Sequence, residues 1–151
     1  MTSKEVEALL RKGRSYAGRS KYHEAVAYYE KALSLDPGNP EPWFLRASVG
    51  IETGKNTEAL ADCVRALTLD QNYADAWAKK GHALYNLGRF EEALFSCTRA
   101  LALKGNDATV WYIKGVCLDE LGRTGEAQEA YAKSLELEII QDIEHEKKSS
   151  G

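Results

Sequence analysis

Small and apolar residues recur at helical spacing within residues 74–107. Trp77, Gly81 and Leu84 stand at positions i, i+4 and i+7, which places them on one face of a helix. Gly88 follows them, and glycine readily takes the left-handed conformation that ends a helix. The pattern therefore predicts an amphipathic helix that begins near residue 74 and ends before Gly88.

The same stretch then predicts a second helix. Residues 90–92 read Phe-Glu-Glu, and the two acidic side chains favour the positive end of a helix dipole. Ala93, Cys97 and Ala100 repeat the i, i+4, i+7 spacing, and residues 104–107 form a cluster of turn formers. Two helices joined by a short turn form an antiparallel pair, and the small residues let the two helices approach closely.

This pair is one copy of a repeat with a period of 34 residues. Four series show the period: Trp43, Trp77 and Trp111; Ala25, Ala59, Ala93 and Ala127; Ala32, Ala66 and Ala100, with Ser134 in the next slot; and Gly54, Gly88 and Gly122. A fixed period of this length indicates stacked units, each too small to bury its apolar face alone. We expect one array over residues 1–148, with units at about 6–39, 40–73, 74–107 and 108–139.

The last unit has no turn signal after residues 135–140, Leu-Glu-Leu-Glu-Ile-Ile. We expect its helix to continue to about Lys147, with residues 139–147 serving as a cap. Ile139, Ile140 and Ile143 would cover the exposed end of the stack, because a repeat array needs a terminal cap for solubility. Residues 149–151 are interpreted as a tail or a cloning remnant.

Composition narrows the class of protein. The 151 residues carry a net charge of −3, which supplies no basic excess for a nucleic-acid backbone. No apolar run approaches the roughly 20 residues that a membrane helix needs. The first residues contain no apolar signal stretch. We therefore expect a cytoplasmic protein that binds neither nucleic acid nor a membrane.

Candidate chemistry is sparse. Cys63 and Cys97 occupy the slot that Tyr29 and Tyr131 fill in the other units, which indicates buried packing positions rather than metal or redox sites. The chain has no glycine-rich phosphate loop, no paired-cysteine motif and no His-Glu-x-x-His sequence. No serine or cysteine has an evident base at helical spacing. The sequence predicts no cofactor, no metal and no enzymatic activity.

The repeat resembles the tetratricopeptide repeat family over about 130 of the 151 residues. The first unit carries the pattern most fully, with Gly13, Tyr16, Ala25, Tyr29, Ala32 and Pro37. The departures are Lys12, Arg46, Lys80 and Lys114 in place of Leu, Gln71, Gly105 and Ile139 in place of Pro, and Gly50 in place of Tyr. The resemblance implies an all-α, right-handed superhelix whose first helices line a concave groove for a segment of a partner protein.

The groove face holds residues that a solvated helix face would not carry. The face opposite the core positions contains apolar and polar candidates for partner contact: Phe44, Leu45, Tyr112, Ile113 and Val116, the basic Arg11, Arg14, Lys79 and His82, and Ser48 and Tyr85. An apolar patch on such a face indicates an interaction surface, and the basic residues suit an acidic group of the partner. Sideways packing between neighbouring first helices, or self-association, remains the alternative.

Two partner classes known in the family do not fit these residues. One subclass clamps the C-terminal carboxylate of heat-shock chaperones with Lys, Asn and Arg, and the matching slots here hold Leu10, Arg14, Leu45, Asp75 and Lys79. A start one repeat later gives Phe44, Ser48, Lys79, Thr109 and Ile113. A heat-shock chaperone tail is therefore disfavoured. An asparagine ladder is absent too, because its slots hold Arg11, Leu45, Lys79 and Ile113.

The sequence thus predicts a non-catalytic scaffold that binds a peptide-like segment of another protein. Self-association into a homo-oligomer is the alternative in the same class, and an enzyme is the alternative in a different class.

Overall fold

The computed structural model describes residues 2–151, and these residues form eight α-helices and no β-strand. The helices are α1 (Thr2–Gly18), α2 (Tyr22–Leu35), α3 (Pro40–Glu52), α4 (Asn56–Leu69), α5 (Ala74–Asn86), α6 (Phe90–Leu103), α7 (Ala108–Glu120) and α8 (Thr124–Ser150). The predicted all-α architecture is confirmed, because each repeat forms two helices joined by a short turn.

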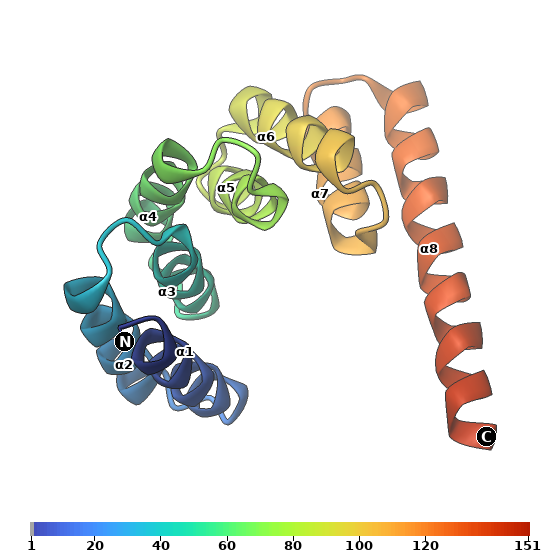
Figure 1. Ribbon diagram of the computed structural model, residues 1–151. Coiled ribbons are helices and arrows are strands. Elements are labelled where there is room, and N and C mark those ends of the chain that lie inside the picture. The colour runs from blue at the N-terminus through green and yellow to red at the C-terminus, as the bar shows by residue number, and fades with distance from the viewer. Residues whose placement is uncertain (1) are drawn as a thin grey trace.

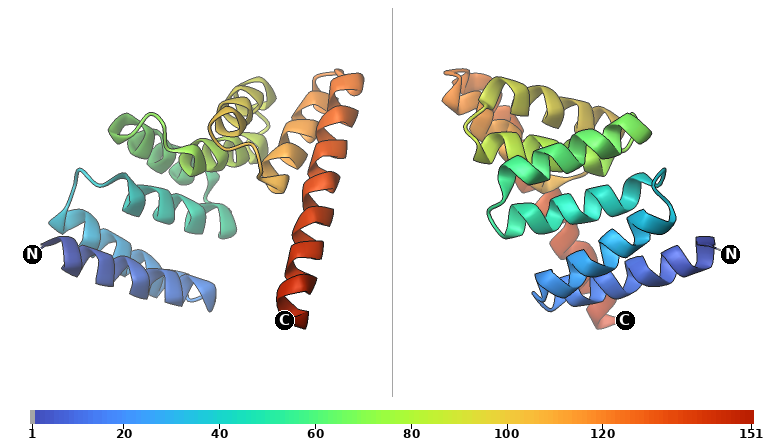
Figure 2. Two further views of the ribbon diagram at one scale, coloured as in Figure 1. Left: turned by 45° about the vertical axis from the view of Figure 1, so that its right-hand side comes forward. Right: turned by 90° about the vertical axis from the view of Figure 1, so that its left-hand side faces the viewer.

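The helix pairs follow one another along an arc (Figure 1). The odd-numbered helices α1, α3, α5 and α7 lie on the inner side of the arc, and α2, α4 and α6 lie on the outer side. Side views show the successive pairs stacked with a progressive turn, which makes the array an α-solenoid (Figure 2). The inner helices therefore supply the concave surface.

Small residues form the core between the two helices of each pair. Ala25, Ala59, Ala93 and Ala127 are all completely buried. Cys63 and Cys97 are completely buried, as predicted for packing residues. Burial raises the pKa of both thiols to about 12. Such thiols stay protonated near neutral pH and are poor nucleophiles.

The basic residues in the leucine slot of the repeat have a packing role. Each places its charge over an aromatic ring of its own unit: Lys12 over Tyr28, Arg46 over Trp43, Lys80 over Trp77 and Lys114 over Trp111, at 5.1–5.9 Å from the ring centroid. The cation is attracted by the ring face, and its aliphatic stem covers apolar surface. This contact accounts for the departure from leucine.

Left-handed residues end the first helix of every unit. Gly54, Gly88 and Gly122 have φ values of 77°, 74° and 78°. The next amide then donates back to the helix, as Arg89 does to the Leu84 carbonyl at 2.9 Å. In the first unit the same position holds Ser20, with φ of 59°. A residue with a β-carbon is strained in this conformation. The turn between α1 and α2 therefore has a less favourable backbone energy than the three turns that contain glycine.

The last helix continues as the sequence predicts, but its isoleucines remain exposed. α8 runs unbroken from Thr124 to Ser150, slightly past the expected end near Lys147, and it includes two of the three residues interpreted as a tail. Ile139, Ile140 and Ile143 are 50%, 43% and 47% exposed, so they do not cover the stack in the single chain. The helix projects beyond α7 because no glycine or proline interrupts it after Leu135 (Figure 1).

Ser20→Gly should raise the free energy of unfolding by about 1 kcal/mol, because glycine takes a positive φ without the steric cost that a β-carbon imposes. Urea unfolding followed by circular dichroism measures the change. The reverse substitution at an equivalent turn, Gly88→Ser, should lower stability by a similar amount. Equal or lower stability of Ser20→Gly would show that the first turn is not strained.

Candidate partner-binding groove

Three successive inner helices enclose a cavity on the concave side. Its volume is about 330 Å³, and its walls come from α3, α5 and α7 with the turn before α7. The lining residues are Phe44, Asp75, Ala78, Lys79, His82, Asp107, Thr109, Val110 and Ile113. Four of the predicted groove residues therefore meet in one place, although they are far apart in the sequence.

A second cavity of about 300 Å³ lies near the N-terminal end, among α1, α2 and α3. It brings together the predicted groove residues Arg14, Leu45 and Ser48 with Ala17 and Glu52. The hydroxyl of Ser48 already donates to the Phe44 carbonyl at 3.1 Å. The remaining candidates, Arg11, Tyr85, Tyr112 and Val116, line neither cavity.

The aromatic candidates differ in how much surface they offer. Phe44 is half-buried, and its ring centroid lies 5.3 Å from that of Tyr73. Tyr112 is 54% exposed, and its ring packs 5.7 Å from Tyr131. Removing Phe44 would disturb the stack, whereas Tyr112 offers a ring to a partner without holding the core together. Tyr85 is half-buried against Phe90.

Sideways packing accounts for part of the apolar face. Ile113 is only 4% exposed and belongs to a core cluster with Leu84, Val110 and Cys117. It forms the floor of the cavity among α3, α5 and α7, so its main contacts are internal. Val116 is half-buried in the same helix. A single helix face could not reveal this, because the other members of its core cluster include residues of α5 and α6 in the preceding unit.

The charges around the first cavity are unevenly engaged. Asp107 caps α7 by accepting from the amides of Thr109 and Val110, and Asp75 pairs with Lys104 at 3.6 Å. Lys79 makes no ion pair with any residue that the structure describes. Burial and the nearby Lys79 ammonium both lower the pKa of His82. The cavity therefore offers one unpaired cation beside a neutral imidazole at neutral pH.

In the second cavity the charge is largely neutralised. Arg14 of α1 forms an ion pair with Glu41 of α3. Both side chains are substantially exposed, so the pair contributes little to stability. Arg11 is exposed on the same helix. Lys79 is thus the better candidate for an acidic group of a partner.

Comparison with known proteins agrees with this repeated architecture. Tetratricopeptide repeat family models match residues 6–39, 74–107 and 108–138, and a further TPR repeat model matches residues 51–88. Together these ranges cover most of the chain. The chain belongs to the tetratricopeptide repeat family. No curated protein sequence matches it.

Several solved tetratricopeptide repeat structures share its fold. A crystal structure of MamA has a TM-score of 0.78 at 24% identity, covering 91% of this chain and 80% of that one. The first repeat domain of Spaghetti (RPAP3), bound to the HSP90 peptide SRMEEVD, has a TM-score of 0.76 at 31% identity, with 80% and 95% covered. The Arabidopsis OM64 repeat domain has a TM-score of 0.76 at 23% identity, with 80% and 99% covered.

No helix formed by residues 2–151 combines the length and the apolar character that a membrane crossing requires.

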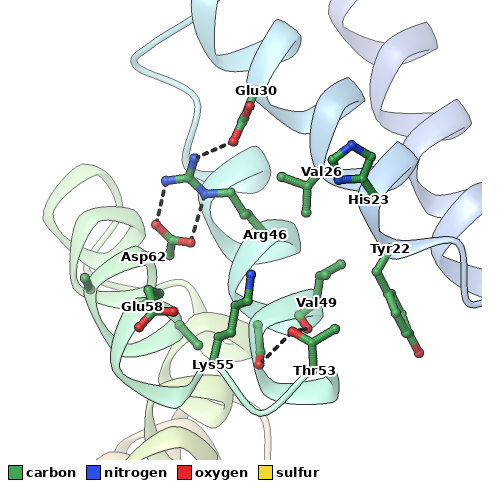
Figure 3. Close-up of a pocket in the computed structure, with 13 residues that line it drawn as sticks. Tyr22, His23, Val26, Glu30, Arg46, Val49, Thr53, Lys55, Glu58 and Asp62 are labelled. Carbon is green, nitrogen blue, oxygen red and sulfur yellow. Dashed lines mark hydrogen bonds and ion pairs between the residues drawn. The ribbon is translucent and has the colours of Figure 1, made fainter.

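The tetratricopeptide array also contains a larger pocket that the sequence analysis did not find. This pocket has a volume of about 600 Å³ and lies among α2, α3 and α4 (Figure 3). Val26 and Val49 supply apolar wall, and His23 and Lys55 also line the pocket. On one side Arg46 forms a bidentate contact with Asp62, at 2.9 and 3.0 Å.

The pocket arises from a pair of small residues at the first junction between units. At the later junctions, Leu60 packs against the cluster that contains Leu84, and Leu94 against the cluster that contains Leu118. At the first junction, Val26 stands at the position that Leu60 and Leu94 occupy in later units. Gly50 stands at the position of Leu84 and Leu118. The missing side chains leave α2 and α3 less tightly packed than later neighbours. Comparison of paired slots, rather than single motifs, would have found this signal.

Gly50 cannot easily fill the pocket, because an added β-carbon would lie 3.0 Å from the Ala59 β-carbon. Val26→Leu extends apolar surface from the opposite wall. We expect it to raise the free energy of unfolding by about 0.8 kcal/mol, the value of one buried methylene. Thermal and urea unfolding measure the change.

Val64→Leu is the matched control, because Val64 sits in α4 and is 46% exposed. Both variants gain the same small helix propensity, so their difference isolates the filling of the pocket. Equal effects of the two substitutions would show that Val26 does not face an unfilled space.

Proposed function

We propose that the chain is a non-catalytic module that binds an extended or helical segment of another protein on its concave surface. The cavity among α3, α5 and α7 carries this proposal, because it combines an apolar floor with an unpaired cation. Apolar clefts with a few polar groups are typical of binding sites. Tyr112, on the same inner helix as Ile113, adds an exposed aromatic ring of the kind that anchors interfaces.

The charges favour an acidic group in the bound segment. Asp75 and Asp107 are engaged by Lys104 and by the start of α7, so they do not neutralise Lys79. A carboxylate near Lys79 would gain a charge-assisted hydrogen bond in a partly desolvated site. The same carboxylate would favour protonation of His82 and offset the shift that burial causes. Binding of such a segment should therefore weaken with added salt.

A heat-shock chaperone tail remains disfavoured as the occupant, although a similar structure holds such a peptide. The clamp slot at Leu10 is only 2% exposed and carries no polar group, and the next slot holds the apolar Leu45. In the third repeat Asp75 takes the place of one of the clamp cations and is already paired with Lys104, so only Lys79 matches the clamp. Titration of the SRMEEVD peptide should therefore give no saturable binding.

We place this activity in the cytoplasm and assign the chain a scaffolding role. Self-association through the groove is the second candidate, because apolar surface on α7 is exposed. Light scattering over a concentration series separates the two, since a homo-oligomer gains mass with concentration and a monomer does not.

The decisive variants are Tyr112→Ala and Lys79→Glu combined. Affinity capture from the native host with the wild-type chain identifies bound proteins, and titration then measures the affinity of each. We expect the double variant to lose at least about tenfold in affinity, because truncation of an anchor commonly costs 2 kcal/mol or more.

Phe95→Ala with Arg99→Glu is the matched control on the outer helix α6, where Phe95 is 65% exposed. Like the groove variant, this control replaces one aromatic residue by alanine and one basic residue by glutamate, but on the convex side. We expect it to bind the partner with full affinity. If the groove variant keeps its partner and the α6 variant loses it, the binding surface is convex and the proposal fails.

A further inference from the structure

An apolar stripe runs along the part of α8 that projects beyond the array. The stripe consists of Leu135, Ile139, Ile140 and Ile143, which are 43–57% exposed. Leu135, Ile139 and Ile143 are spaced i, i+4 and i+8, so they lie within about 80° of one another around the helix. Ala127, Ala130 and Ser134 are buried on the other side of α8. The α8 stripe thus faces away from the rest of the chain.

The stripe begins at a position that receives a helix elsewhere in the array. Leu135 stands one period after Leu101 and two periods after Leu67. Leu101 and Leu67 are 9% and 7% exposed, because they share core clusters with Val110 of α7 and Ala76 of α5, in the following units. Leu135 is 57% exposed. In earlier units a helix of the following unit covers this position, but no helix formed by residues 2–151 covers Leu135.

The charges along the stripe are predominantly negative, with Lys133 before it and Lys147 after it. Residues 134–146 contain Glu136, Glu138, Asp142, Glu144 and Glu146 and no lysine or arginine. Lys133 reaches only Glu136, at 3.6 Å. The flanks of the apolar surface are therefore acidic over more than three helical turns.

This pattern opposes pairing with a second copy. An antiparallel pair centred on Ile139 would bring Glu136 of each helix toward Asp142 of the other. A parallel pair would place every acid beside its own copy. Like charges at such positions destabilise helix pairs, and an anionic lipid surface or nucleic acid would be repelled in the same way. The complementary surface is an apolar face flanked by cations.

We propose that the α8 stripe docks an amphipathic helix of a partner protein, with Lys and Arg on both flanks of its apolar face. The docked helix lies over Leu135 as α7 lies over Leu101, and its cations meet the acids of residues 136–146. The surface is separate from the concave groove, so both sites can be occupied together. Docking also orders the projecting helix, because an unpacked helical segment of this length is marginal in water.

The test uses two designed peptides of about 18 residues, or five helical turns. Both carry leucine on one face, with lysine on the flanks of the first and glutamate on the flanks of the second. Fluorescence anisotropy of the labelled peptides is measured with the full chain, at low salt and at about 0.15 M salt. We expect saturable binding of the lysine peptide, weakened by salt, and at least tenfold weaker binding of the glutamate peptide.

Two variants locate the site. The double variant Ile139→Gln with Ile143→Gln keeps the charge and nearly the helix propensity of α8. We expect it to bind the lysine peptide with at least tenfold lower affinity. Tyr112→Ala, in the groove, should bind that peptide like the wild type. Circular dichroism confirms that both variants stay folded, and the substituted isoleucines are too exposed for the array to depend on them.

Three results would overturn the proposal. Equal binding of the two peptides would show that the acidic flanks select nothing. Unchanged binding by the isoleucine variant, or loss of binding by Tyr112→Ala alone, would place the site elsewhere. A dimer seen by light scattering that disappears in the isoleucine variant would assign the stripe to a second copy of this chain.

Discussion

The close crossing of two helices within each unit is the contact on which the array depends. At each crossing a small residue of the first helix faces the second helix: Gly13 faces Tyr29, Ala47 faces Cys63, Gly81 faces Cys97 and Gly115 faces Tyr131. A β-carbon on Gly115 would lie 2.6 Å from a ring carbon of Tyr131. Because interiors are close-packed, this approach sets the distance between the two helices of a unit and fixes which face of the first helix is turned toward the second.

The proposed binding surfaces follow from that geometry. Once the small face of each inner helix is turned toward its partner, the opposite face lines the concave side and forms the cavity that holds Lys79 and His82. The first junction departs from the pattern at Gly50, where α3 approaches Ala59 closely and leaves a pocket beside Val26. At the other end, Leu135 of α8 occupies the slot that Leu67 and Leu101 fill in earlier units, and it stays exposed among residues 2–151.

The helix pairs could be predicted because the small-residue positions and the turn glycines repeat at one period, and both effects act within a unit. Contacts between units were harder to predict. Ile113 is a groove residue by its position on its own helix, but it is buried in a core cluster that includes residues of α5 and α6. The continuation of α8 could be predicted from the missing turn signal, but the sequence pattern does not show whether its isoleucines fold back over the stack or stay exposed. The pocket beside Gly50 depends on a pair of residues in different units, which no single motif reports.

Equilibrium urea unfolding of Gly115→Ala, compared with Gly125→Ala, tests the role of the helix crossing most directly. Gly115 faces Tyr131, so the added methyl should overpack the crossing and lower the free energy of unfolding by about 1–3 kcal/mol. Gly125 has open space around it in the first turn of α8, and alanine there should stabilise by up to about 1 kcal/mol. If Gly115→Ala were as stable as Gly125→Ala, the close crossing would not be the constraint that organises the array.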